Sequence, residues 1–158
     1  SLGQGLSCAV GMALAGKRDH KDYMVYAVVG DGEADEGQIW EAVMAAYRYH
    51  LDNLVVIIDN NGLQIDGTTD EIMPQLDLTK KFDAFGYDTY EIDGHNMEQI
   101  METFDKIHAA KDGRPKFINA HTVKGKGVSY MENQLAWHGM APNDEQYQQA
   151  VRELEEGI

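Results

Sequence analysis

The sequence is poor in cysteine and in positive charge. Its single cysteine, Cys8, can form neither an internal disulfide nor a thiolate metal site, so we expect a reducing cytoplasmic compartment. We expect the Cys8 side chain to be a small, buried apolar group. Only 13 lysines and arginines stand against 27 acidic residues, which gives a formal charge of -14. Nucleic acid and anionic membranes require clustered basic residues, so neither is expected as a partner.

Long apolar runs, internal repeats and low-complexity tracts are also missing. No run approaches the ~18 apolar residues that a membrane-spanning helix needs, and no basic-then-apolar signal segment opens the sequence. With 158 residues, 43% of them apolar, the chain is long enough for a substantial core, and we predict that residues 1–158 form a single domain. Because the sequence opens without methionine, within a segment typical of a loop that leads into a helix, we interpret it as a fragment that lacks its upstream segment.

Two apolar segments, residues 26–29 and 54–58, each run directly into an acidic loop that contains glycine. The loops are Gly-Asp-Gly at 30–32 and Asp-Asn-Asn-Gly at 59–62, and residues 36–49 between them have the spacing of an amphipathic helix. This order predicts a βαβ unit. Its two loops should lie side by side at the carboxyl edge of a parallel sheet, where open α/β sheets bind ligands.

The remaining segments continue the alternation of helix and strand. Asn96 with Gln99 suggests a capping box, and Asn143 can cap a last helix whose stripe of Tyr147, Ala150, Val151 and Leu154 should be buried. The sequence therefore predicts an α/β fold, a three-layer, mostly parallel sheet with helices on both faces. We expect helices at 1–18, 79–85 and 97–111, strands at 88–92 and 115–123, an irregular segment at 68–79 and a long loop at 124–143.

Asp31 and Asn61 supply a carboxylate and an amide oxygen in the two loops. With backbone carbonyls they provide too few ligands for a calcium cage, but they suit Mg²⁺, which completes its octahedral shell with water and phosphate. Glycines beside Asp31 let backbone amides approach a phosphate, and the helix after them directs its positive end there. The acidic side chains of the first loop would repel a bare diphosphate, so a divalent cation must lie between them. We therefore expect metal and diphosphate to bind as one unit.

Two simpler interpretations compete with this one. Turns between strands and helices are rich in Asp, Asn and Gly in any case, so either loop alone fits an ordinary turn. A calcium EF-hand fails on spacing, because the twelfth position from Asp31 is Ala42 and the sixth from Asp59 is Gln64.

The whole stretch resembles the thiamine-diphosphate motif, which opens with Gly-Asp-Gly and closes with a paired-Asn segment. Within that family, GDGEADEGQIWEA followed by LDNLVVIIDNNGLQIDG is similar to transketolase, in particular the amino-terminal subunit of split transketolases. The similarity extends to SLGQGLS at the start, DGHN at 93–96, HTVKGKGVSYMEN, and WHG at 137–139. It covers most of the chain and implies the thiamine-diphosphate-binding fold.

The resemblance also implies roles for individual residues. Metal ligands would be Asp31, Asn61 and the backbone carbonyl of Leu63, with magnesium, or calcium in its place, as the ion. The implied cofactor contacts are Gly32 and Asn61 to the diphosphate, Leu2 beside the thiamine rings, and His138 near diphosphate and donor sugar. Glu36 would belong to a network of acids that links paired active sites.

The activity implied by the resemblance is transfer of a two-carbon ketol unit from a ketose phosphate to an aldose phosphate, as in the pentose phosphate pathway. The activating glutamate of that family lies on a pyrimidine-binding domain or subunit, so we expect a homo- or hetero-oligomer and predict that the isolated chain is inactive. Two alternatives stay open. One is another thiamine-diphosphate enzyme, such as deoxyxylulose-phosphate synthase or a 2-oxo acid dehydrogenase subunit; the other is a non-catalytic module with the same fold.

Overall fold

The computed structural model describes residues 2–110 and 112–157, and its centre is a parallel sheet of four strands. The strands pair in the order β1-β2-β4-β3, and every pairing is parallel. Their bounds are β1 (Val25–Gly30), β2 (Leu54–Asn60), β3 (Asp88–Asp93) and β4 (Lys116–His121).

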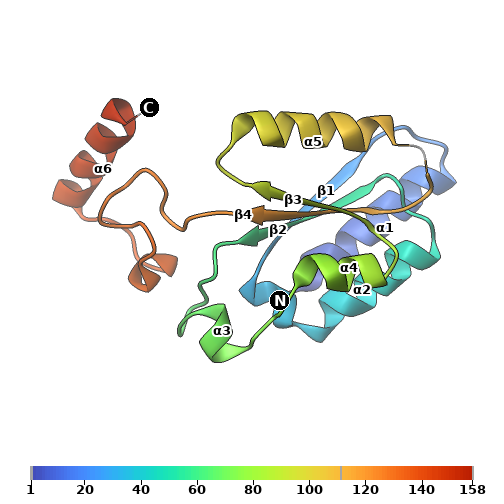
Figure 1. Cartoon of the computed structure of the whole chain (residues 1–158), viewed down its shortest axis with the longest axis horizontal. Coiled ribbons are helices and arrows are strands. Elements are labelled where there is room, and N and C mark those ends of the chain that lie inside the picture. The colour runs from blue at the N-terminus through green and yellow to red at the C-terminus, as the bar shows by residue number, and fades with distance from the viewer. Residues whose placement is uncertain (1, 111, 158) are drawn as a thin grey trace.

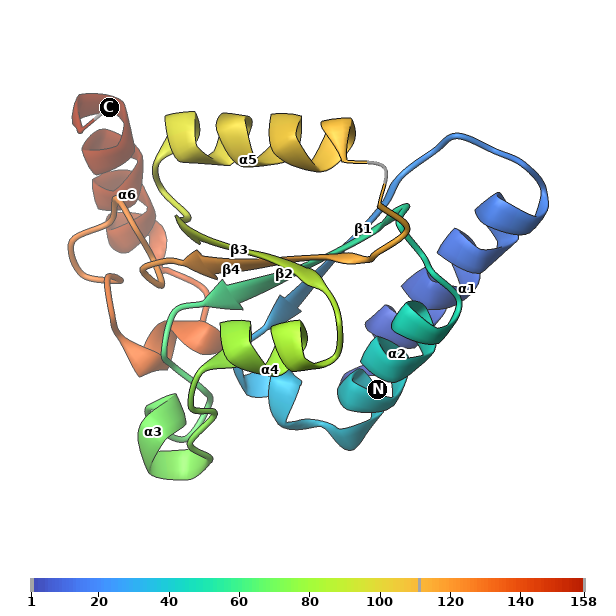
Figure 2. The same ribbon diagram turned by 45° about the vertical axis from the view of Figure 1, so that its right-hand side comes forward.

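Helices cover both faces of this sheet, which confirms the predicted three-layer α/β fold. On one face lie α1 (Gln4–Arg18), α2 (Gly37–Arg48) and α4 (Leu78–Ala84), and on the other lies α5 (Met97–Ala109) (Figures 1 and 2). The shorter elements are a 3-10 helix (Gly32–Asp35), α3 (Thr69–Ile72) and a second 3-10 helix (Leu135–His138), and α6 (Asp144–Glu156) is the last helix.

The larger part of the core lies between the sheet and α1, α2 and α4. There the rings of Phe82 and Phe117 stack with their centroids 3.7 Å apart, and Tyr87 meets Phe82 edge-on at 5.3 Å. A smaller cluster, which includes Ile107 and Ile118, lies under α5. Since β2 is covered on both faces, its continuous apolar sequence is the pattern expected of a buried parallel strand.

The strand register places the two acidic loops next to each other. Gly30 pairs with Asp59 at the end of β1 and β2, and the Asp31 backbone N–H donates to the Asp59 carbonyl at 3.2 Å. The predicted βαβ unit and the side-by-side position of its loops are therefore confirmed.

Three local predictions were wrong. Cys8 is exposed rather than buried, because it lies on the face of α1 that points away from the sheet. The segment at 68–79 contains α3, whose start is fixed by a capping box between Thr68 and Glu71. In the predicted box at Asn96, Gln99 donates its backbone N–H to the Asn96 side chain, but its own side chain accepts from Asp93 N. The expected end of α5 at Lys111 lies outside the described residues.

The stripe on α6 is also less buried than predicted. Ala150 is 9% exposed, but Tyr147 is 60% and Leu154 is 40% exposed. The physical reason is position: α6 stands apart from the sheet and packs on the loop that precedes it (Figure 1). Residues 124–157, named here the C-terminal lobe, are joined to the sheet through the end of β4.

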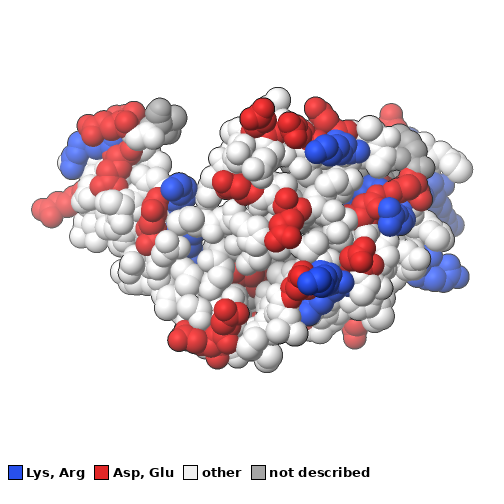
Figure 3. Space-filling view, in the orientation of Figure 1, with Lys and Arg blue, Asp and Glu red and all other residues white. Residues whose placement is uncertain are grey.

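The charged surface follows the acidic composition. On the face shown in Figure 3, acidic side chains spread over α3, α5 and α6 with few basic ones between them. None of the helices in the described part of the chain combines the length and apolarity needed to cross a membrane.

Candidate functional site

A cleft of about 400 Å³ opens at the carboxyl edge of β1 and β2. Its walls come from the start of α1, the two acidic loops and the C-terminal lobe. Six of the seven site residues predicted from sequence line it: Leu2, Asp31, Gly32, Asn61, Leu63 and His138. The structure therefore brings together side chains that are far apart in the sequence.

Asp31 is the most constrained of these residues. The residue is 2% exposed, and its two carboxylate oxygens accept the backbone N–H groups of Gly32 at 2.7 Å and Gly62 at 2.5 Å. Burial raises the pKa of Asp31, and the two backbone hydrogen bonds oppose that rise. Among the described residues, other carboxylates form ion pairs with basic side chains, but Asp31 forms none.

Asn61 and Leu63 form the facing wall. The Asn61 side-chain oxygen accepts the Leu63 backbone N–H at 3.1 Å, which is an Asx-type turn, and Gly62 between them has a φ of 73°. Because Gly62 lies in the left-handed region, a side chain there would be strained. This turn aims the Gly62 amide at Asp31 and so joins the two loops.

The donor set of the cleft fits a magnesium ion. A carboxylate, an amide oxygen and a backbone carbonyl are hard oxygen ligands, and an oxygen that accepts one N–H keeps a lone pair for a metal. Among the described residues, no three His, Cys, Asp or Glu side chains gather closely enough to hold a metal by themselves. A site here therefore needs additional oxygen ligands, such as water or a diphosphate.

Glycine at position 32 is required by close packing. A Cβ atom built there would lie 2.9 Å from Cγ of Gln64. The bare backbone of Gly32 thus faces the cleft at the start of the first 3-10 helix, where it can approach a bound phosphate closely.

Glu33 has a positional role that sequence reasoning missed. Its carboxylate accepts the backbone N–H of Gly3 at 2.8 Å and that of Gly30 at 3.4 Å. The start of α1 is thereby fixed to the first loop, and Leu2, which is 56% exposed, is placed at the cleft wall. No local signal announces this contact, because Gly3 and Glu33 are distant in the sequence.

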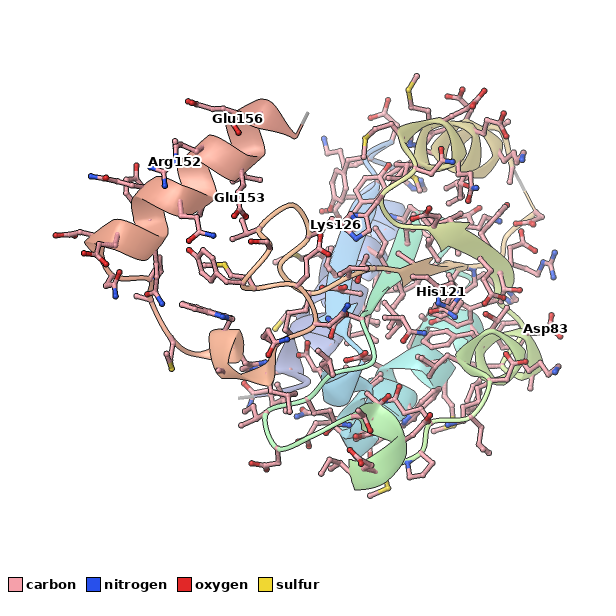
Figure 4. The ribbon with its side chains drawn as sticks, turned by 60° about the vertical axis from the view of Figure 1, so that its left-hand side comes forward. Asp83, His121, Lys126, Arg152, Glu153 and Glu156 are labelled. Carbon is pink, nitrogen blue, oxygen red and sulfur yellow. The ribbon has the colours of Figure 1, made fainter. Side chains whose placement is uncertain are left out.

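His138 and Lys124 reach the cleft from the C-terminal lobe. The lobe has its own internal bonds: Trp137, next to His138, donates to the Tyr130 carbonyl at 2.9 Å. Figure 4 shows Glu153 projecting from α6 toward the preceding loop, where it accepts from the backbone N–H of Ser129 at 2.6 Å.

Glu36, the seventh predicted site residue, and the histidines of the DGHN and HTVKG segments, His95 and His121, lie outside the cleft lining. Glu36 is the N-terminal cap of α2 and packs close to Gly3, so its predicted role in a network between active sites stays a prediction. His121 pairs with Glu91 at 2.6 Å, and His95 accepts the backbone N–H of Val123 at 2.8 Å.

Comparison with known proteins gives a consistent result. The family model described as "Transketolase, thiamine diphosphate binding domain" matches residues 1–155. The chain is 51% identical to one subunit of the apulose-4-phosphate transketolase of Phocaeicola vulgatus and 48% identical to a 6-deoxy-6-sulfo-D-fructose transketolase subunit of Clostridium sp.. These alignments cover 100% and 98% of the chain but 56% of each relative, so the chain spans about half the length of these relatives.

Solved structures show the same relationship. Transketolase from Campylobacter jejuni superposes with a TM-score of 0.91 at 29% identity, over 98% of this chain and 25% of that one. A transketolase mutant from Pichia stipitis, at 24% identity, gives 0.89 over 98% of this chain and 24% of that one, which shows the shared fold.

Proposed function

The chain belongs to the transketolase family, as its thiamine diphosphate-binding domain, and from this premise we propose that it supplies the magnesium-diphosphate half of a transketolase active site. The reaction is transfer of a two-carbon ketol unit from a ketose phosphate to an aldose phosphate. The observation that carries the proposal is the convergence of Asp31, Asn61 and Leu63 on one cleft, with a buried carboxylate that no ion pair of the described residues neutralises.

The roles proposed for the chain's own residues follow from their positions. Asp31, Asn61 and the Leu63 carbonyl hold Mg²⁺, with Ca²⁺ as a substitute. Gly32 and Asn61 contact the diphosphate, and Leu2 offers an apolar wall for the thiamine rings. His138 donates or accepts a hydrogen bond at the donor sugar. Thiamine diphosphate, when bound, supplies the carbanion chemistry of the transfer.

The proposal requires a partner. Both of the relatives described above are named as subunits of a transketolase rather than as whole enzymes. We propose that this protein likewise functions in an oligomer, with a pyrimidine-binding subunit or domain that provides the activating glutamate, in the cytoplasm. Residues 1–158 alone are then inactive. Since these relatives are named for apulose 4-phosphate and for a sulfofructose, the sugar substrate need not be a pentose phosphate.

The test combines binding and turnover, with the full-length protein assembled with its partner. Calorimetric titration with thiamine diphosphate should give binding that depends on Mg²⁺, and a ketose donor with an aldose acceptor should be converted. Turnover of pyruvate instead of the sugars would identify another thiamine-diphosphate enzyme. Binding without any turnover would identify a non-catalytic module, and binding heat that is indifferent to Mg²⁺ would refute the metal site.

A further inference from the structure

Asp35 lies behind the cleft rather than in it. Its two carboxylate oxygens each accept a side-chain amide, Oδ1 from Gln75 Nε2 at 2.9 Å and Oδ2 from Gln64 Nε2 at 2.8 Å. Gln75 is 8% exposed and also donates to the backbone carbonyl of Asp31. We propose that Asp35, Gln64 and Gln75, named here the Asp35 clamp, hold the two metal-binding loops in the geometry that Mg²⁺ requires.

The first arm of the clamp acts on Asp31. The Asp31 carbonyl already accepts the Ala34 backbone N–H at 3.0 Å inside the 3-10 helix, and Gln75 reaches the same oxygen from the segment before α4. The peptide group after Asp31 is therefore fixed by two donors. With its side chain held by the amides of Gly32 and Gly62, Asp31 has little freedom left.

The second arm acts on the other loop. Gln64 follows Leu63 directly, so the carbonyl proposed as a metal ligand belongs to the peptide that joins these two residues. Gln64 is held by Asp35 at its side chain and by the Gly67 carbonyl at its backbone N–H, at 2.8 Å, while its Cγ packs against Gly32. One carboxylate thus sets both the Asp31 peptide and the Leu63 peptide.

Asp35 is not itself a candidate ligand. Neither Asp35 nor Gln75 lines the cleft, and both carboxylate oxygens of Asp35 already accept hydrogen bonds from side-chain amides. Its role is positioning. Groups that orient metal ligands from behind typically affect metal affinity by roughly 10- to 100-fold when they are changed.

The test exchanges donor and acceptor within the clamp and rests on the proposed function. In Asp35→Asn the carboxylate becomes a neutral amide with one acceptor oxygen. Even when Gln64 turns its side-chain amide to present Oε1, both hydrogen bonds lose their charged acceptor, which about halves their strength. We expect Mg²⁺-dependent binding of thiamine diphosphate to weaken by roughly 10- to 100-fold. The double variant Asp35→Asn with Gln64→Glu restores the charge-assisted bond between positions 35 and 64 with donor and acceptor reversed, at unchanged net charge, and leaves the remaining oxygen at position 35 to accept from Gln75. Because Gln64 lines the cleft, recovery in this variant is measured on the backbone rather than on the affinity.

The measurement is calorimetric titration of Mg²⁺ at fixed thiamine diphosphate, with the full-length protein and its partner. Asp83→Asn, an exposed carboxylate on α4, is the matched control (Figure 4). Hydrogen exchange of the Gly62 amide without ligand is a second readout, and it should speed up in Asp35→Asn and return to the wild-type rate in the double variant.

Each outcome decides the matter. Wild-type affinity in Asp35→Asn, or exchange of the Gly62 amide in the double variant as fast as in Asp35→Asn, overturns the clamp and leaves the proposed function standing. If Asp35→Asn does not fold, Gln64→Ala removes the second arm alone, and unaltered Mg²⁺ affinity in that variant overturns the clamp. A wild-type protein whose binding ignores Mg²⁺ refutes the proposed function and the clamp together.

Discussion

The two edges of the sheet differ in the groups that compensate their buried charges. At the amino edge, where β3 and β4 begin, Lys116 has a fully buried side chain and lies 2.6 Å from Asp88 and 2.5 Å from Asp112. Arg114 adds a further ion pair with Asp88. At the carboxyl edge, Asp31 is equally buried but is held only by backbone amides, without an ion pair to another described residue.

This contrast separates stability from function. A buried carboxylate costs free energy unless a cation or hydrogen bonds compensate it, and at the amino edge the compensation is internal. At the carboxyl edge the burial that raises the pKa of Asp31 is only partly offset. Lys124 also lines the cleft and opposes the rise, and under the proposed function a bound cation would supply further positive charge beside Asp31.

The largest expected effect is on stability, and it comes from removing the buried ammonium group at the amino edge of the sheet. Replacing Lys116→Met removes the buried ammonium and leaves Arg114, which is half-exposed, as the cation that Asp88 and Asp112 share. Because the buried ammonium is lost while Arg114 still pairs with both carboxylates, we expect a loss of about 3 kcal/mol in the free energy of unfolding, the low end for a broken buried pair, measured by urea denaturation. Mg²⁺ dependence of cofactor binding should be unaltered in the folded fraction. A loss as small as that of a surface variant would show that this cluster is not a stabilising element.

Removing the buried carboxylate at the carboxyl edge of the sheet should affect cofactor binding rather than stability. Asp31→Ala removes the one buried carboxylate of the proposed metal site, and we expect Mg²⁺-dependent affinity for thiamine diphosphate to fall by roughly 100-fold. Calorimetry of the assembled protein measures this. In metal-free buffer the variant should lose less stability than Lys116→Met, because the lost carboxylate was buried at a cost. The opposite ranking of the two variants would abolish the contrast between the edges.

A smaller effect is expected from the lobe side of the cleft. His138→Ala should lower the rate of ketol transfer about tenfold, the value of one hydrogen bond to a charged group, while the dependence of cofactor binding on Mg²⁺ stays as in the wild type. Steady-state kinetics and calorimetry together check this split. His121→Ala is the control, because His121 is a half-exposed histidine outside the cleft. Loss of metal dependence in His138→Ala would place that residue in the metal site instead.

The smallest effect concerns acid stability at the amino edge. A proton shared with Asp88, whose own pKa is raised by burial, and the hydrogen bond from Lys116 hold the pKa of Asp112 well below its usual range. The stabilisation is therefore present above about pH 4 and is lost as the pH falls through the lowered pKa. At neutral pH Asp112→Asn should melt at a lower temperature than the wild type. The loss in the free energy of unfolding should be less than about 1 kcal/mol, because this pair is partly exposed. The difference should vanish in strong acid, and a difference that grows toward acid would contradict the assignment.

Sequence reasoning predicted the fold because its signals are local. Continuous apolar runs marked the strands, helical spacing marked α2 and α5, and strand ends told where Asp31 and Asn61 would meet. The box of Thr68 and Glu71 that starts α3 was also a local signal, and it was overlooked. The positions of the candidate site residues could thus be anticipated, whereas their roles rest on the resemblance and stay predictions.

Contacts between distant segments could not be derived in this way. Glu33 holds Gly3, and Asp35 holds Gln75, only because the folded chain brings their loops together. Exposure of Cys8 and of the α6 stripe likewise depends on which elements stand opposite them. From the sequence, the acidic residues of the first loop should repel a phosphate. In the structure, some of them accept hydrogen bonds that fix the loops around the cleft.

The placement of the two tryptophans gives each region its own fluorescent reporter. Trp40 packs between Phe82 and Phe85 in the main core, while Trp137 lies against Tyr130 in the C-terminal lobe. A Trp40→Phe protein would emit from the lobe alone, and a Trp137→Phe protein from the core alone. Melting curves recorded on this pair would show whether the lobe that carries His138 loosens before the sheet does.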